Sequence, residues 1–296
     1  MPPRDAVDVP LADGRHLRVR MTPGRGRPVV LLHGLLDDAT GWAGVTARAT
    51  SPCVAVDLPG FGGSSAPREA TLAAYAQDVA EALERMEIAH ATVVGHSLGG
   101  GVAAALAQRS SVVDALALLA PVGFGTIRLA ELASLPGIRH GLRAALPLGL
   151  ANPLVVAAAY STLVAHRRLP SADLVARLSR GALRSGRGAR MAVEAVAAAG
   201  RDAQDPAPPF AFEGPVAAVW GARDALVPPA HAAALRRAYP QARVEVWDGM
   251  GHHPQRERAA ELDRFLVRAA WSARTRAAAR WGAPGPTVVP IARKAA

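Results

Sequence analysis

Short apolar runs alternate with longer amphipathic runs over most of the chain, apart from a long middle section. A short apolar run bounded by glycine, proline or polar residues is typical of a buried strand, and apolar positions at helical spacing are typical of a helix. The predicted strands are Val29–Leu32, Val54–Val56, Ala91–Val94, Ala115–Leu119, Val216–Trp220 and Val244–Trp247. The predicted helices are Ala39–Ala49, Thr71–Met86, Gly100–Gln108, Ala230–Tyr239 and Gln255–Trp271. This alternation predicts an α/β fold in which helices cover both faces of a mostly parallel sheet.

The N-terminal segment has a weaker, alternating pattern. Val7–Arg20 alternates between apolar and polar positions, with Asp13-Gly14 near its centre. An Asp-Gly pair between two short alternating runs predicts an antiparallel hairpin ahead of the parallel strands.

The middle section, from Phe124 to about Pro209, has no strand pattern. Its helical runs are Arg128–Leu135, Leu154–Ala165, Ala172–Leu183 and Ala189–Ala199, and the proline-rich stretch Asp205–Pro209 is typical of a linker. We therefore predict a helical cap, residues 124–209, inserted into a core formed by residues 1–123 and 210–275. The alternative is that these helices elaborate the helical layers of the sheet itself. Residues 276–296 hold glycine, proline and basic residues and are predicted to form a flexible tail.

The composition narrows the class of protein. Half of the 296 residues are hydrophobic and 4% are aromatic, so the core must consist mainly of alanine, valine and leucine. The net charge of +10 comes almost entirely from arginines, which are scattered from Arg15 to Arg280. Clustered basic residues with aromatic interleaving would favour nucleic acid, so this scatter predicts no nucleic-acid partner and leaves an attraction to anionic substrates or lipids open. Because Cys53 is the single cysteine, the chain cannot form an internal disulfide.

Two stretches bear on export and on membranes. Met1–Asp5 is not followed by an apolar stretch, so we expect no signal peptide and a cytoplasmic location. Ala144–Ala165 carries no charge and is long enough to cross a bilayer, but two prolines, a glycine and an asparagine interrupt it. We predict two short helices in this stretch and no stable membrane insertion.

One strand-to-helix junction carries the pattern Gly-x-Ser-x-Gly. It occupies residues 95–99, with Ser97 at its centre, between the predicted strand Ala91–Val94 and the predicted helix Gly100–Gln108. A tight turn there strains the serine backbone and exposes its hydroxyl, and the two glycines let strand and helix pass close together. The amides that open the helix point towards negative charge forming beside the serine. We predict that Ser97 is a nucleophile rather than a solvated serine in a glycine-rich turn.

A serine hydroxyl needs a base before it attacks at neutral pH, and two later loops supply candidates. His252 lies in the glycine-rich loop after Val244–Trp247, and Asp224 lies in the loop after Val216–Trp220. Because the carboxyl ends of parallel strands share one edge of the sheet, these loops converge there with Ser97. We predict that His252 removes the serine proton, while Asp224 fixes the histidine tautomer and stabilises the imidazolium. The order serine, aspartate, histidine along the chain fits this architecture.

Other residues compete for these roles. His253 is the alternative base, but its neighbour Pro254 is expected to turn the ring towards the closing helix. We expect His33 and His96 to be structural residues that bond loop backbone near the site. Four other acids are less suitable than Asp224. Asp114 precedes its predicted strand, and Glu131 and Asp205 belong to the predicted cap or its exit. Asp248 lies too near His252 in sequence to orient its ring.

Attack on a carbonyl creates an oxyanion, which needs hydrogen-bond donors that are fixed in advance. The backbone amide of Leu98 is one predicted donor. The second is expected in the loop that follows Val29–Leu32 and begins with His33. There we predict the amide of Leu35, with that of Leu36 as the alternative. We expect neither a metal nor a cofactor in this site.

Together these motifs resemble those of the α/β-hydrolase superfamily. The resemblance rests on His33-Gly34, on the Asp-Leu-Pro-Gly-Phe-Gly of residues 57–62, on residues 95–100, and on residues 220–224 with 251–254. It covers most of the chain apart from residues 124–209 and 276–296. It implies an α/β-hydrolase fold with an inserted helical cap and a catalytic triad of Ser97, Asp224 and His252. It also implies an oxyanion hole formed by the amides that follow Gly34 and Ser97.

The nucleophile separates the branches of this superfamily. The similar dehalogenases and epoxide hydrolases carry aspartate at the position of Ser97, so the resemblance implies the serine-nucleophile, esterase- or lipase-like branch. It implies cleavage of a carboxylic ester or related acyl compound through an acyl-serine intermediate. Because the predicted cap is rich in alanine, leucine and valine, the expected small-molecule acyl substrate carries an apolar group. Acyl transfer, C–C bond hydrolysis or perhydrolysis would use the same residues, and a non-catalytic ligand receptor is a further alternative.

Overall fold

A single mixed sheet forms the centre of the molecule. The computed structural model describes residues 6–163, 170–172, 174–176, 179, 193–196 and 210–268. Among these residues, eight strands pair in the order β1-β2-β4-β3-β5-β6-β7-β8. They are β1 (Val7–Pro10), β2 (His16–Thr22), β3 (Val29–Leu32), β4 (Cys53–Val56), β5 (Ala91–His96), β6 (Val113–Leu119), β7 (Val216–Gly221) and β8 (Arg243–Trp247). The strands β3 to β8 run parallel, which confirms the predicted α/β fold.

The first two strands form the predicted antiparallel hairpin at one edge of the sheet. Val7 pairs with Val19 and Pro10 with His16, and β2 then pairs antiparallel with β4. Gly14 in the connecting turn has φ +82, a conformation that glycine adopts without strain.

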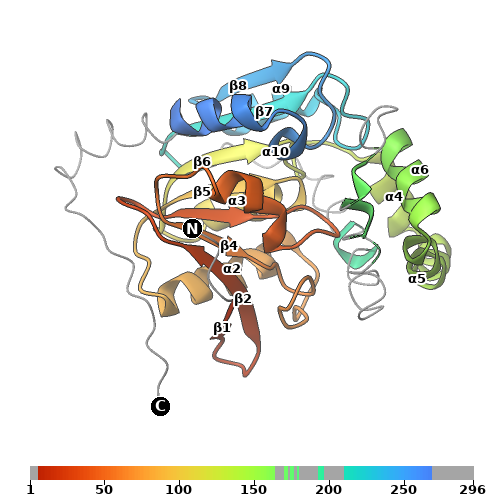
Figure 1. Cartoon of the computed structure of the whole chain (residues 1–296), viewed down its shortest axis with the longest axis horizontal. Helices are drawn as coiled ribbons and strands as arrows, with labels where there is room; N and C mark the ends of the chain where they lie inside the picture. Colours follow the sequence, from red (N-terminus) through yellow and green to blue (C-terminus); the bar gives the residue numbers. More distant parts are fainter. Residues whose placement is uncertain are drawn as a thin grey trace.

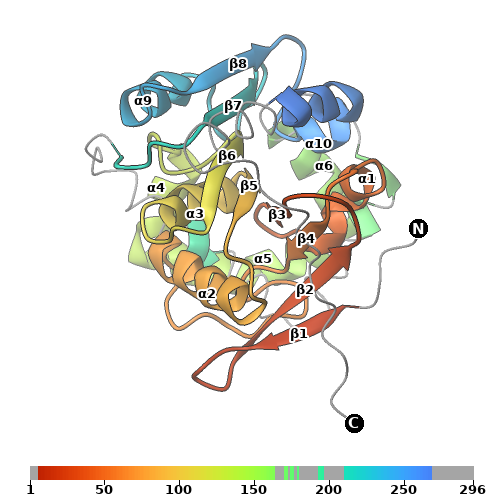
Figure 2. The ribbon, with the colours of Figure 1, turned by 90° about the vertical axis from the view of Figure 1, so that its left-hand side faces the viewer.

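Helices pack on both faces of the sheet (Figure 2). Successive strand residues point to opposite faces, so Val30 and Leu32 join the core beneath α2, α3 and α9, while Leu31 joins the core beneath η1 and α1. These helical segments are η1 (Ala39–Trp42), α1 (Ala43–Thr46), α2 (Leu72–Arg85), α3 (Leu98–Ala107), α9 (His231–Ala238) and α10 (Pro254–Glu257). Thr71 caps α2 as a hydroxyl acceptor for the amide of Ala74, at 3.1 Å.

The helices α4 (Arg128–Ser134), α5 (Pro136–Ala151) and α6 (Pro153–Leu163) lie together beside the carboxyl ends of the parallel strands (Figure 1). The sequence predicted α4 and α6 but not the full length of α5. Pro147 does not end α5, and the chain breaks at Asn152 instead. Residues 172, 174–176, 179 and 193–196 are also helical. The linker predicted at Asp205–Pro209 and the tail predicted at residues 276–296 lie outside the described residues.

Two predicted boundaries were wrong. The helix after Ser97 begins at Leu98 rather than Gly100, because β5 extends to His96 and the chain turns into α3 at the serine itself. The closing helix is not continuous: α10 ends at Glu257, Arg258 is bent, and residues 259–268 are helical again.

Among the residues that the structure describes, no single helix is both long and apolar enough to span a bilayer. Gly137–Ala151 and Pro153–Thr162 reach that length only as a pair, and their axes are bent by 108° at the break between them.

Replacing Gly99 by alanine tests the close packing of α3 on the sheet. A Cβ atom on Gly99 would lie 2.3 Å from the backbone oxygen of Leu32, so the helix must shift. We expect Gly99→Ala to lower the free energy of unfolding by about 1–3 kcal/mol in urea denaturation. The matched control is Gly141→Ala in α5, where a Cβ meets nothing within 4 Å and alanine is expected to stabilise by up to about 1 kcal/mol. Equal unfolding free energies for the two variants would contradict this packing.

Candidate active site

Ser97 occupies the sharp turn between β5 and α3. Its φ of 53° and ψ of −115° are strained for a residue with a side chain. The surrounding backbone holds this conformation: the Ser97 amide donates to the oxygen of Leu119 at 2.9 Å, and the Ser97 carbonyl accepts from Gly100, Gly101 and Val122. The residue is 5% exposed. The predicted strained turn is therefore present, with the serine at the carboxyl end of β5.

Asp224 and His252 form a buried hydrogen-bonded pair. The Nδ1 atom of His252 lies 2.7 Å from Oδ2 of Asp224, and their side chains are 2% and 0% exposed. The other carboxylate oxygen of Asp224 accepts from the amides of Leu226 and Val227, at 3.0 and 2.9 Å. Because a carboxylate accepts, Nδ1 of His252 donates in this pair, and Nε2 is the ring nitrogen left for another partner.

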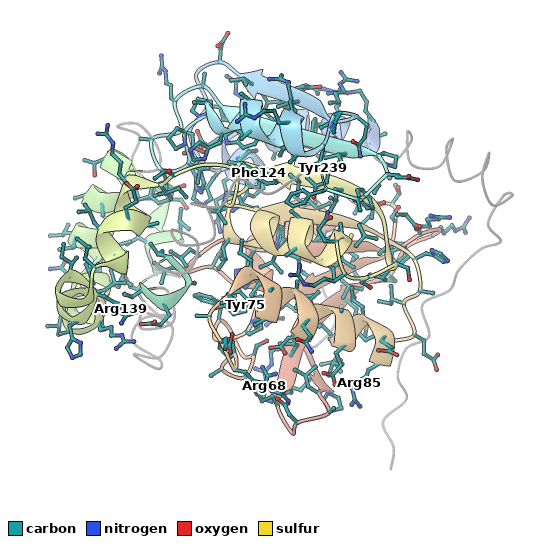
Figure 3. The ribbon with its side chains drawn as sticks, turned by 180° about the vertical axis from the view of Figure 1, so that it is seen from behind. Arg68, Tyr75, Arg85, Phe124, Arg139 and Tyr239 are labelled. Atoms are coloured by element: carbon teal, nitrogen blue, oxygen red, sulfur yellow. The ribbon has the colours of Figure 1, made fainter. Side chains whose placement is uncertain are left out.

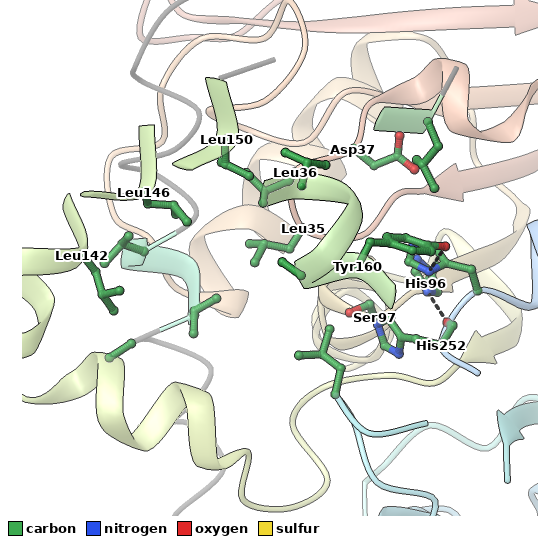
Figure 4. A pocket seen from close by; sticks show the side chains of 18 residues that line it. Leu35, Leu36, Asp37, His96, Ser97, Leu142, Leu146, Leu150, Tyr160 and His252 are labelled. Atoms are coloured by element: carbon green, nitrogen blue, oxygen red, sulfur yellow. Dashed lines mark hydrogen bonds between the residues drawn. The ribbon is translucent and has the colours of Figure 1, made fainter. Parts of the chain in front are cut away.

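Ser97 and His252 line the same pocket (Figure 4). Among the described residues, Nε2 of His252 is buried and has no hydrogen-bond partner, so no bond joins it to the serine hydroxyl in this structure. Such bonds are commonly long before a substrate binds and shorten when the complex forms. The structure thus brings Asp224 and His252 into direct contact and brings Ser97 to the same cavity.

The loop that carries His252 is held by side chains from other parts of the site. The two carboxylate oxygens of Glu257 accept from the amides of Gly251 and His253, at 2.8 and 2.9 Å. Nε2 of His96 lies 2.8 Å from the carbonyl oxygen of His252 and must donate to it. Sequence reasoning missed Glu257, because it lies four residues after the N-cap His253, one position beyond the spacing of a capping box.

His33 and His96 are structural, as predicted. Nε2 of His33 accepts from the amide of Leu58 at 2.9 Å, so its Nδ1 is protonated and donates to the oxygen of Gly34 at 2.7 Å. His96 is buried beside His252, and burial holds its pKa well below the ordinary value of 6.5 because desolvation disfavours the charged ring. His96 therefore stays neutral next to the candidate base.

The predicted orientation of His253 was wrong. Its ring does not turn towards the closing helix but into the pocket, where Nδ1 lies 3.1 Å from the hydroxyl of Tyr160 in α6. The two rings stack with centroids 5.4 Å apart. Pro254 starts α10 and carries the backbone away, while the space under α6 accepts the imidazole. Burial also holds the pKa of His253 well below its ordinary value.

The other acids that were considered for the role of Asp224 either do not line the pocket or lie outside the described residues. Asp114 is the second residue of β6, within the strand rather than before it, and it pairs with Arg27 and His90. Glu131 belongs to α4, and the side chain of Asp248 is exposed. Asp205 lies outside the described residues. Within the described ranges, no group of three or more histidine, cysteine or acidic residues is arranged to hold a metal ion.

The predicted oxyanion donors come from two places. The Leu98 amide opens α3 and has no carbonyl of its own helix to bond. Leu35 and Leu36 both line the pocket, and Leu36 adopts a φ of 61°. Arg256 ties this loop to α10, since its guanidinium lies 2.7 Å from Oδ2 of Asp37. Sequence reasoning missed this ion pair, which joins residues far apart in the chain.

The pocket has a volume of about 250 Å³ and mostly apolar walls. Three leucines of α5 (Leu142, Leu146 and Leu150) line the part of the pocket that is farther from Ser97, while Tyr160 lies close to His96 (Figure 4). The helices α4, α5 and α6 thus supply much of the wall opposite the serine. Figure 3 shows these helices from behind, with Arg139 labelled on α5.

Comparisons with known proteins agree with this fold. The chain is 32% identical over 269 residues to an uncharacterised protein of Mycobacterium tuberculosis, covering 82% of this chain and 76% of that protein. It is 35% identical over 267 residues to the dihydrolipoyllysine-residue acetyltransferase component of the acetoin cleaving system of Cupriavidus necator, covering 86% and 66%. Among solved structures, an esterase of Exiguobacterium antarcticum superposes with a TM-score of 0.74 at 20% identity, covering 90% and 99%.

A sequence model of one family covers most of the chain. Residues 27–259 match the family described as the alpha/beta hydrolase fold, a range that includes the strained serine, the buried aspartate–histidine pair and the helices over the pocket. The chain therefore belongs to the α/β-hydrolase fold family.

Proposed function

We propose that the protein is a serine hydrolase that cleaves a carboxylic ester with an apolar group through an acyl-Ser97 intermediate. The observation that carries this proposal is the state of His252. Its Nδ1 is bound to buried Asp224, and its Nε2 is left free in the cavity that Ser97 lines. A neutral histidine in that tautomer is the base that a serine hydroxyl needs.

The proposed first step forms the acyl-enzyme. Nε2 of His252 takes the proton of Ser97 as Oγ bonds to the substrate carbonyl carbon, and the carbonyl π electrons move to oxygen. The amides of Leu98 and Leu35 donate to that oxyanion, while Asp224 stabilises the imidazolium. The tetrahedral adduct then expels the alkoxide, which takes the proton from His252. A water molecule repeats the sequence on the acyl-enzyme and releases the acid.

The environment of His252 supports this role. His96 and His253 pack against its ring with centroids 4.8 and 5.3 Å away, and burial keeps the pKa of both neighbours low. The neighbouring rings are therefore neutral at pH 7, so a positive charge that develops on His252 meets Asp224 and no adjacent imidazolium.

The walls of the pocket support an apolar substrate. We propose that residues 124–209 act as a cap and that its leucines, Leu142, Leu146 and Leu150, accept the acyl chain. Burying an apolar chain against such side chains stabilises binding by about 0.8 kcal/mol per methylene.

Acyl transfer is a second candidate function. It is supported by the 35% identity with the acetyltransferase component of Cupriavidus necator, a protein that is named for a transfer reaction. The same residues would form the acyl-enzyme, and an alcohol or thiol would replace water in the second step. Product analysis with a competing alcohol separates the two reactions.

Removing the nucleophile is the direct test of the proposal. We expect Ser97→Ala to lower kcat for p-nitrophenyl butyrate by at least about 10³-fold, because no hydroxyl remains to form the acyl-enzyme. The measurement is steady-state release of p-nitrophenol, with circular dichroism as the check on folding. Turnover at the wild-type rate by a folded variant would refute the assignment.

Changing the acid tests the role of Asp224. Asparagine keeps the shape of the side chain but can present an amide N–H to Nδ1 of His252, which favours the wrong tautomer. We expect Asp224→Asn to lower kcat by about 10³–10⁴-fold. The matched control is Asp248→Asn, the same change on an exposed carboxylate four residues before His252. Equal activity of the two variants would show that Asp224 has no catalytic role.

The buried histidines predict how stability depends on pH. His96 and His253 have pKa values well below 6.5 in the folded protein, so below pH 6.5 the unfolded chain binds more protons than the folded one. The contribution of these histidines to the free energy of unfolding is therefore greatest above this pH. It falls as the pH drops, by up to about 1.4 kcal/mol per pH unit for each histidine. Urea denaturation between pH 7.5 and 5 measures the slope. We expect His253→Gln to reduce the slope without abolishing it, because the pKa values of His96 and His231 are also lowered by burial. An unchanged slope would contradict the account.

A further inference from the structure

The helices α5 and α6 are apolar on the side that faces solvent as well as on the side that faces the pocket. In α5, Leu142, Leu146 and Leu150 line the pocket, and their four-residue spacing puts them on one face. Leu148 lies two residues after Leu146 and two before Leu150, so it is on the face of α5 opposite the pocket, and it is 76% exposed. An ordinary surface helix would carry polar residues there.

The exposed side of both helices has no charged residue at its centre. The exposed residues are Gly137, Ile138, His140, Gly141, Ala144, Ala145 and Leu148 in α5 and Pro153, Leu154, Val155, Ala158, Ala159 and Thr162 in α6, so His140 and Thr162 are the polar ones among them. Leu148 and Leu154, which is 79% exposed, stand on either side of the break at Asn152. We call Leu148, Leu154 and Val155 the α5–α6 corner. Five of the nine exposed large hydrophobic residues in the described part of the chain lie in α4, α5 and α6, and a sixth, Leu135, lies between α4 and α5.

Exposed apolar surface on this scale marks a place where something apolar binds. A membrane-spanning role does not fit the geometry, since α5 and α6 are bent by 108° and neither is long enough alone. A bent pair with leucines at its corner can instead lie in the interfacial region of a lipid layer, with the corner among the acyl chains.

The charge around the corner matches an anionic lipid surface. Residues 126–163 carry three arginines and one acidic residue, and the whole chain has a net charge of +10. Among the arginines of α4, α5 and α6, Arg143 pairs with Glu194 through Nε at 2.7 Å, Arg139 is half-buried, and Arg128 is exposed. Basic residues beside an apolar face strengthen binding to anionic headgroups.

We propose that the α5–α6 corner docks the protein on an anionic lipid surface, from which the pocket receives an amphiphilic acyl ester. This inference rests on the proposed function for the nature of the substrate, while the docking itself is independent of catalysis. The inner faces of the same two helices line the pocket with Ser97, so docking brings the apolar cavity next to the layer in which such an ester is dissolved.

Vesicle sedimentation tests the docking without any turnover. The full chain carrying Ser97→Ala is mixed with vesicles of phosphatidylcholine alone or with about one third phosphatidylglycerol, and the bound fraction is measured. We expect binding to the anionic vesicles that weakens as salt is raised, and at least about tenfold weaker binding to phosphatidylcholine alone. Binding to neither vesicle, or equal binding to both at every salt concentration, would overturn the proposal.

Two substitutions at the corner locate the surface. We expect Leu148→Glu with Leu154→Glu to weaken binding to anionic vesicles at least about tenfold, because both leucines lose their place in the acyl region. The matched control is Val246→Glu, which adds the same charged side chain at a valine that is 45% exposed on β8. Unchanged binding of the corner variant, or equal loss in the control, would contradict the assignment.

Two further measurements separate this proposal from its alternatives. With Ser97 intact, the corner variant should hydrolyse a soluble short-chain ester at the wild-type rate, which shows that the pocket is unaffected. Analytical ultracentrifugation should give the same sedimentation coefficient for the wild type and the corner variant. A dimer that dissociates in the corner variant would show that the α5–α6 corner binds a second copy of the chain, and would overturn lipid docking.

Discussion

The close crossing of α3 over the sheet is the constraint on which the rest of the site depends. A Cβ atom on Gly95 would lie 2.3 Å from the oxygen of Gly99, and one on Gly99 would lie 2.3 Å from the oxygen of Leu32. With no side chain at either position, the chain passes from strand to helix at a single residue. Ser97 therefore takes a strained conformation at the carboxyl edge, next to the first amides of α3.

Polar side chains hold the loops that meet this edge, because the loops have little regular structure of their own. Glu257 bonds the amides on both sides of His252, and His96 bonds its carbonyl. Asp224 is fixed by two amides of its own loop. These bonds hold the backbone on both sides of His252 and the Nδ1 edge of its ring, so the imidazole is positioned before any substrate arrives. The apolar helices opposite form much of the pocket wall.

The sequence predicted the parts of the molecule that depend on local pattern. Apolar runs marked the parallel strands, and the positions of Ser97, Asp224 and His252 after three of them indicated a shared edge. The orientation of His253 could not be predicted in this way, because it depends on Tyr160, which lies 93 residues earlier in the chain. The ion pair of Asp37 and Arg256 spans 219 residues. Such contacts arise from tertiary packing, which the local periodicity of the sequence does not reveal.

The central claim is that the hydroxyl of Ser97, activated by His252, becomes acylated during turnover. The most direct measurement is mass spectrometry of protein quenched during hydrolysis of p-nitrophenyl butyrate, followed by peptide mapping. The account predicts a butyryl adduct on the peptide that contains Ser97, formed within the burst of p-nitrophenol release. Continued turnover with no adduct, or with the adduct on another residue, would contradict it.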